Sequence, residues 1–276
     1  MQKIILPQDQ VDHIINLYNS KNSITKISKL LNIGRDVIAR HLKESGVIIR
    51  KLGSDLRKYP LREDYFDNID SEDKAYFLGL LFADGCNHRN DKKKISISLQ
   101  SCDKDILSKF SQYLYGAENL QFIKTRKHYK DQYCLSIHST HVSDVLNTLG
   151  CVARKSLVLK FPDIQEKLIK HFIRGYFDGD GSLYYYTRRN KPEYTLSIVS
   201  TKDFTDKLKY ILNKELNIHV CDKLTGNNNI THTIYVRGNK QVSKLLDWLY
   251  LDTNLYLERK YNKYLELKSL HNNKLI

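Results

Sequence analysis

Two stretches decide the fold of this chain: residues 75–85, AYFLGLLFADG, and residues 171–181, HFIRGYFDGDG. Each is a mostly apolar run with a glycine in its middle, and each ends in an acid followed by glycine. The closing acids, Asp84 and Asp180, are 96 residues apart, and the central glycines have the same spacing. A repeat at this distance indicates a duplicated domain and not a solenoid.

The central glycines, Gly79 and Gly175, predict that two buried helices pack closely side by side, because a residue without a side chain lets backbones approach. If the helices are parallel, their C-terminal ends meet and the carboxylates of Asp84 and Asp180 converge. Carboxylates held this close repel each other unless a cation lies between them, and hard oxygen ligands suit Mg²⁺. The alternative is two unrelated buried helices that each stop at Asp-Gly, a common helix end.

FLGLLFADG and IRGYFDGDG resemble the two copies of the LAGLIDADG motif in single-chain homing endonucleases. This resemblance implies that Asp84 and Asp180 bind the catalytic metals, Mg²⁺ or Mn²⁺, with the carbonyls of Ala83 and Gly179 as further ligands. It implies a site-specific endonuclease that hydrolyses both strands of a DNA duplex at a long target site. Asp178 stays outside the catalytic set, since its position in the motif more often faces away from the metal.

The resemblance adds three further catalytic residues. Gln100 ends a strand where the family often keeps a polar residue beside the metal, and Ser200 holds the matching place in the second half. This difference predicts unequal cutting rates for the two DNA strands. Lys155 and Lys260 match basic positions near the scissile phosphates, where they would stabilise negative charge in the transition state. For both lysines the alternative is an ordinary surface position.

Composition favours a polyanionic partner, because the 276-residue chain has a formal net charge of +14 and a pI of about 9.4. The alternative is a soluble protein that is merely rich in lysine. Five scattered cysteines without a C-x-x-C pair indicate free thiols in a reducing compartment. No apolar run reaches the roughly 18 residues of a membrane span, and no signal peptide is visible. We expect a monomeric cytoplasmic protein of a bacterial or phage-infected cell, with an organelle as the alternative.

Residues 1–48 are predicted to form a small helical domain, with helices over residues 8–20, 24–31 and 35–45. A helix, a three-residue turn with glycine and a second helix resemble the helix-turn-helix of DNA-binding proteins. The last helix would then enter a major groove. The candidate DNA contacts on it are Arg35, Arg40 and His41. The alternative is a generic three-helix cap.

The remaining chain is predicted to contain a linker, residues 49–72, and two repeats, residues 73–168 and 169–276. Both repeats show the order α-β-β-α-β-β-α, which indicates an α+β fold. The expected strands are residues 95–99, 120–127, 132–138, 183–187, 194–199, 220–224 and 233–237. The expected helices after the first motif are residues 103–115, 141–149, 201–216, 240–250 and 255–267. Residues 86–94 are expected to form a polar hairpin tip.

The resemblance also implies that the sheet of each repeat forms half of a saddle that lies in the DNA major groove. Because a strand alternates its faces, the polar side chains of one face would meet the DNA. The candidate DNA contacts are Lys94, Ser96, Ser98, Lys124, Arg126, Tyr184, Tyr186, Arg188, Arg189, Thr195, Ser197, Lys223 and Arg237. Taken singly, each is as well explained as a surface residue or phosphate contact.

Two other functions compete with DNA cleavage. Some proteins with this resemblance are catalytically inactive DNA-binding regulators, and others are RNA-splicing maturases. A dead nuclease usually loses one of the two acids, whereas this chain retains both Asp84 and Asp180. A calcium loop at Asp178 is excluded, because the position that needs a glutamate is Arg189.

Overall fold

The computed structural model describes residues 4–50, 58–88, 94–126, 130–225 and 231–272, with the side chains of residues 94, 97–101 and 271–272 outside that description. The chain divides into two compact units, Met1–Leu61 and Arg62–Ile276. None of the described helices is both long and apolar enough to cross a membrane.

The N-terminal unit contains α1 (Gln8–Asn19), α2 (Ile24–Leu31) and α3 (Arg35–Glu44). The Ser23 hydroxyl caps α2 by accepting from the Lys26 amide at 3.1 Å. Asn32 ends the same helix in the left-handed conformation, at φ 53°. The buried core of the unit consists of Ile14, Tyr18, Ile27, Ile38 and Leu42. The three predicted helices are confirmed to within one residue at their ends.

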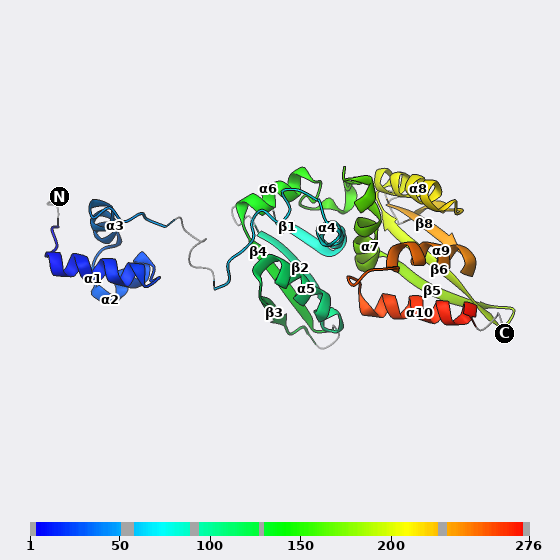
Figure 1. Cartoon of the computed structure of the whole chain (residues 1–276), viewed down its shortest axis with the longest axis horizontal. Coiled ribbons are helices and arrows are strands. Elements are labelled where there is room, and N and C mark those ends of the chain that lie inside the picture. Colours follow the sequence, from blue (N-terminus) through cyan, green and yellow to red (C-terminus); the bar gives the residue numbers. More distant parts are fainter. Residues whose placement is uncertain (1–3, 51–57, 89–93, 127–129, 226–230, 273–276) are drawn as a thin grey trace. The chain divides into compact units, whose positions relative to one another are not determined.

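The C-terminal unit contains two four-stranded antiparallel sheets with the same topology (Figure 1). The first sheet has the order β1-β2-β4-β3, formed by β1 (Gly85–His88), β2 (Lys94–Gln100), β3 (Leu120–Ile123) and β4 (Gln132–His138). The second has the order β5-β6-β8-β7, formed by β5 (Ser182–Arg188), β6 (Lys191–Ser200), β7 (Cys221–Thr225) and β8 (Thr231–Arg237). This repetition confirms the predicted fold class.

Each sheet is covered on one face by helices, and the two motif helices lie between the sheets (Figure 1). The motif helices are α4 (Glu72–Asp84) and α7 (Ile169–Asp180). The covering helices are α5 (Lys104–Tyr115) and α6 (Thr140–Thr148) on the first sheet, and α8 (Lys202–Leu216) and α9 (Asn239–Tyr250) on the second. The last helix, α10 (Glu258–Asn272), packs on α9. Apolar residues of the covered strand faces, such as Ile95 and its cross-strand partner Ile137, are fully buried.

Several predicted boundaries are wrong; β6, for example, begins at Lys191 and not at residue 194. Residues 85–88 form β1 and not a hairpin tip. The buried position in this strand is taken by a polar residue, Asn87, which donates to the carbonyls of Ser143 and Cys151. The apolar alternation that predicts a strand is therefore missing from the sequence. Residues 89–93 lie outside the described part. The strand from residue 120 ends already at Ile123, and residue 127 lies outside the description. The last helix begins at Glu258 because Asp178 accepts from the preceding Leu257 amide. All five cysteines are free, as predicted.

Candidate active site

The helices α4 and α7 meet at their central glycines. A Cβ atom added to Gly79 would lie 2.1 Å from the Phe172 carbonyl oxygen, and one added to Gly175 would lie 1.9 Å from the Tyr76 carbonyl oxygen. Ordinary van der Waals contact begins at 3.4 Å. Neither position therefore accepts a side chain unless the two backbones separate. The close packing predicted from the glycines is present.

Asp84 and Asp180 are the last residues of the two motif helices, so this packing brings their carboxylates together. A Cβ atom on Gly179, the residue before Asp180, would lie 2.8 Å from Asp84 Oδ2. Both side chains keep exposed surface, while the surrounding protein removes part of their hydration. This desolvation, with the negative charge of Asp180, raises the pKa of Asp84 to about 6. Desolvation also raises the pKa of Asp180.

Two buried lysines lie beside this pair. Lys155, in the short 3₁₀ helix η2 (Lys155–Leu157), donates to the Gly85 carbonyl. Lys260 of α10 donates to the carbonyls of Phe177 and Gly181, and desolvation lowers its pKa to about 8. The positive charges of both lysines lower the pKa values of the two aspartates. Neither is a surface lysine, since they are 9% and 4% exposed, but their catalytic role stays a prediction.

The two predicted carbonyl ligands lie in the helix interface. Ala83 packs against Gly179, where an added Cβ would lie 2.3 Å from the Ala83 methyl carbon. The Gly179 carbonyl accepts from Lys260 at 3.3 Å. One lone pair of this oxygen therefore already accepts a hydrogen bond from the Lys260 ammonium group. Both carbonyls remain predicted ligands.

The donor set fits a hard divalent cation. In the described ranges there is no group of three or more His, Cys, Asp or Glu residues that could hold a metal. A metal at this place would rest on Asp84 and Asp180, completed by carbonyls and water. Mg²⁺ binds in this way, through one or two carboxylates and several retained waters. The raised pKa values mark carboxylates short of positive charge, which a cation would supply.

A tyrosine that the sequence analysis missed lies next to Asp180. The Tyr176 hydroxyl lies 3.0 Å from Ser200 Oγ, and its hydrogen bond to Asp180 lowers the pKa of that carboxyl group. All three side chains line a cavity of about 230 Å³. The residue at the matching place in α4 is Leu80, so the first half lacks this hydroxyl. The side chain of Gln100 lies outside the described residues. The difference between Tyr176 and Leu80 at the matching position of the two motifs was the sequence signal that could have identified this tyrosine.

An ion pair between the two halves also lies near the site. Arg259 Nε is 3.1 Å from Oδ2 of Asp103, which is 5% exposed. The charge of Arg259 lowers the pKa of Asp84, so the guanidinium contributes to the field at the carboxylates. No local pattern pointed to this pair, because its members are 156 residues apart.

Asp178 is fully buried, and its carboxylate is held by protein donors. It accepts from the hydroxyls of Tyr76 at 2.7 Å and Tyr250 at 2.5 Å, and from the Leu257 amide at 2.9 Å. These bonds tie α7 to α4, to α9 and to the segment that begins α10. Asp178 therefore helps to hold the helix that carries Lys260, and its exclusion from the catalytic set stays a prediction.

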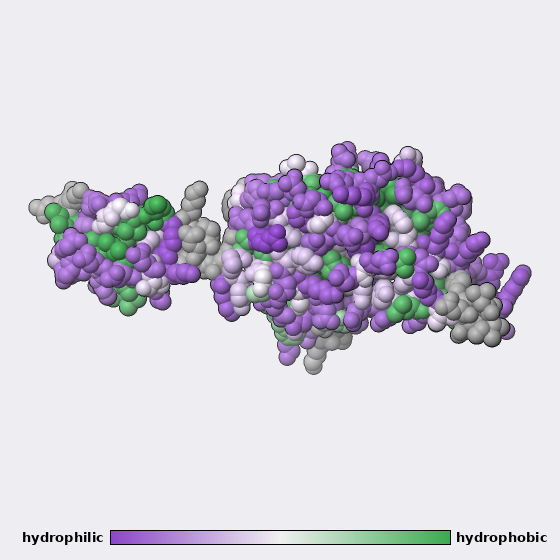
Figure 2. Space-filling model, in the orientation of Figure 1, coloured by the Kyte–Doolittle hydropathy of each residue, from purple (hydrophilic) through white to green (hydrophobic). Residues whose placement is uncertain are grey.

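Most of the predicted DNA contacts in the sheet region are exposed. The described candidates with exposed side chains are Lys124, Arg126, Tyr184, Tyr186, Arg188, Arg189, Lys223 and Arg237. Ser96 is half-buried and accepts or donates a 2.7 Å hydrogen bond with His88. The side chains of Lys94 and Ser98 lie outside the described residues. Hydrophilic residues dominate the visible surface of the C-terminal unit (Figure 2).

Three of the predicted DNA contacts are buried. Thr195 and Ser197 are only 2% and 8% exposed, and they lie on the central strand β6 opposite Tyr184 and Tyr235, respectively. This burial argues against a direct contact with a base. His41 of α3 is 8% exposed and pairs with Glu44 at 3.5 Å, so it faces the helix packing. On the same helix Arg35 is exposed, and half-buried Arg40 bonds the Ile4 carbonyl.

Comparisons with known proteins show what this chain is similar to. The family model of the LAGLIDADG-like domain matches residues 167–249. An uncharacterized protein of Methanocaldococcus jannaschii is 25% identical over 211 residues, which cover 74% of this chain and 72% of that protein. The crystal structure of the LAGLIDADG meganuclease I-AabMI bound to uncleaved DNA matches 72% of this chain and 91% of its own, with a TM-score of 0.51 and 12% identity. The LAGLIDADG homing endonuclease I-LtrWI bound to target DNA matches 76% and 92%, with a TM-score of 0.47 and 12% identity.

Proposed function

We propose that this chain, which carries a LAGLIDADG-like domain and has the fold of a LAGLIDADG meganuclease, is a site-specific endonuclease that cuts both strands of a DNA duplex. The observation that carries the proposal is the meeting of Asp84 and Asp180 at the glycine-packed ends of α4 and α7. Each carboxylate comes from one half of the chain. A single molecule thus contains a complete pair, which supports action as a monomer.

The side chains around the pair have separable roles in phosphodiester hydrolysis. Asp84 and Asp180 would hold the divalent ions, Mg²⁺ or Mn²⁺, which when bound activate a water and stabilise the leaving 3′ oxygen. Lys155 and Lys260 hold positive charge beside the carboxylates and would stabilise the charge that develops on the scissile phosphate. Tyr176 fixes the orientation of Asp180 through the chain of hydrogen bonds that ends at Ser200.

The proposed substrate is a long DNA duplex lying against the two sheets. The net charge of +14 and the exposed lysines, arginines and tyrosines of the strands and their turns support this. We further propose that the N-terminal domain, residues 1–48, adds DNA contacts through α3 and Arg35. It is followed by the linker, residues 49–72, and by repeats over residues 73–168 and 169–276.

An inactive DNA-binding regulator or a maturase would need neither carboxylate. In this chain the two aspartates are accompanied by two buried lysines and by a tyrosine that bonds Asp180, which favours cleavage. A protein that only binds DNA does not need these charged and polar side chains gathered at the C-terminal ends of α4 and α7.

The test is cleavage of a randomised library of DNA duplexes with Mg²⁺ and with a chelator. We expect Mg²⁺-dependent double-strand breaks at one sequence, and their loss in Asp84→Asn and in Asp180→Asn. Asp64→Asn, which changes an exposed acid outside both motifs, is the matched control. Specific binding of the library without any break, in all metals tried, would instead establish the inactive regulator.

A further inference from the structure

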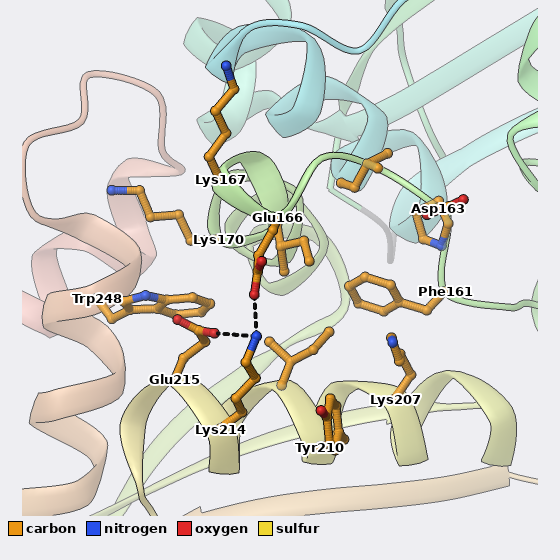
Figure 3. Close-up of a pocket in the computed structure, with 14 residues that line it drawn as sticks. Phe161, Asp163, Glu166, Lys167, Lys170, Lys207, Tyr210, Lys214, Glu215 and Trp248 are labelled. Carbon is orange, nitrogen blue, oxygen red and sulfur yellow. Dashed lines mark hydrogen bonds and ion pairs between the residues drawn. The ribbon is translucent and has the colours of Figure 1, made fainter.

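A pocket of about 430 Å³ lies near the start of α7, at the opposite end from Asp180 (Figure 3). Its walls come from residues 161–170, from α8 and from Trp248 of α9. Lys170 and Asp180 are ten residues apart on one helix, which corresponds to about 15 Å at 1.5 Å per residue. The pocket is therefore separate from the carboxylate pair.

Aromatic side chains form much of the pocket wall. Figure 3 shows Trp248 and Phe161 on opposite sides of the pocket, with Tyr210 of α8 on a third. Phe161 is fixed from behind by Phe172 and Phe204, whose ring centroids lie 5.1 and 5.2 Å away. Trp248 is half-buried, and its indole presents both an apolar face and an N–H donor. A planar ring that enters the pocket thus meets rigid aromatic surface.

Lysines surround this aromatic surface. Within the part of the chain that the structure describes, Lys167, Lys170 and Lys207 have no ion pair, and Asp163 is the remaining unpaired acid of the wall. The fourth lysine, Lys214, pairs with Glu166 across the pocket and with Glu215 at 3.6 Å. The side chains of this pair are 50% and 71% exposed, and exposed pairs contribute at most about 1 kcal/mol. An entering anion can therefore displace Glu166 from Lys214.

We propose that this pocket binds a nucleoside phosphate, with the base against Trp248 and the phosphate among Lys167, Lys170 and Lys207. Nucleobases stack on aromatic side chains irrespective of their sequence, and lysines bind phosphate oxygens through charge-assisted hydrogen bonds. The volume lies in the range of small-molecule sites, roughly 300–1,000 Å³. An uncharged aromatic ligand would leave the lysines unused, and inorganic phosphate would leave the aromatic wall unused. The nucleoside phosphate is either free or part of a single strand.

The experiment uses Trp248, the only tryptophan of the chain, as a reporter that lies in the pocket itself. AMP is titrated into the full chain, and we expect a saturable change of Trp248 fluorescence. Adenosine and inorganic phosphate should bind at least about tenfold more weakly, because each loses one of the two contacts. A short single-stranded oligodeoxyadenylate identifies the source. Tighter binding of the oligonucleotide assigns the pocket to a strand, and tighter binding of AMP assigns it to a free nucleotide.

Charge variants separate the pocket from the general basicity of the chain. Lys170→Gln and Lys207→Gln should each weaken AMP binding about tenfold or more, as expected for one charged hydrogen bond. Lys244→Gln, an exposed lysine on the same helix as Trp248 but outside the pocket, should leave the affinity unchanged. Trp248→Leu, followed with a fluorescent AMP analogue by anisotropy, should lose about tenfold or more. Lack of saturation, or equal weakening by Lys244→Gln in variants that melt like the parent, would overturn the proposal.

Discussion

Replacement of Gly175 by alanine tests whether glycine packing sets the position of the two carboxylates. The added Cβ atom would lie 1.9 Å from the Tyr76 carbonyl oxygen, and ordinary contact needs 3.4 Å, so the helices must separate by about 1.5 Å or tilt. Overpacking costs about 1–3 kcal/mol, and the clash with rigid backbone places this variant at the upper end. The better helix propensity of alanine returns about 1 kcal/mol. We expect a net loss of about 2 kcal/mol in the free energy of unfolding.

Urea unfolding followed by Trp248 fluorescence measures this loss in the C-terminal unit alone, since the chain has no other tryptophan. Cleavage should fall much further than stability, about 100-fold, because a displacement of about 1 Å misplaces the carboxylates. Asn213→Ala is the control. It changes an exposed residue of α8 in the same unit, so both the stability and the cleavage rate should stay at the parental values. A Gly175→Ala protein with parental stability and parental cleavage would refute the reasoning.

Three further results are expected. Asp84→Asn should raise the melting temperature at pH 7.5 and not near pH 4. The pKa of Asp84 in the folded protein, about 6, lies above the model-peptide value of 3.8. Ionisation of Asp84 therefore destabilises the fold as the pH rises from about 4 to about 6. An equal gain at both pH values would contradict this. Tyr176→Phe removes the hydroxyl between Asp180 and Ser200, and should slow one strand cut about tenfold more than the other in a nicking time course; equal slowing would remove the asymmetry. Deletion of residues 1–50 should weaken or broaden DNA binding in a selection from a randomised library, and unchanged affinity and specificity would exclude a role for α3.

The repeated motif allowed the fold to be predicted well. Two apolar runs with the same spacing of glycine and aspartate define α4 and α7, and the strands other than β1 follow from local alternation. The convergence of Asp84 and Asp180 follows from the same pattern, because matched glycines place matched helix ends together.

Features that depend on contacts between distant residues could not be predicted in this way. Arg259 and Asp103 are paired across 156 residues, and nothing in either local sequence distinguishes them from other charged residues. Thr195 and Ser197 alternate correctly for an exposed strand face, yet both are buried on the central strand, opposite Tyr184 and Tyr235, respectively. The sequence of α3 does not show that His41 is buried, because its burial depends on how the other helices pack against α3.

The most direct measurement is cleavage of the polypeptide by Fe²⁺ in place of Mg²⁺, with ascorbate and peroxide, because the radicals formed cut the chain beside the bound ion. Cuts confined to the neighbourhoods of residues 84 and 180, and absent from the Asp84→Asn, Asp180→Asn double variant, are predicted. Cuts at other positions, or the same cuts in the double variant, would show that the two carboxylates do not bind a divalent ion.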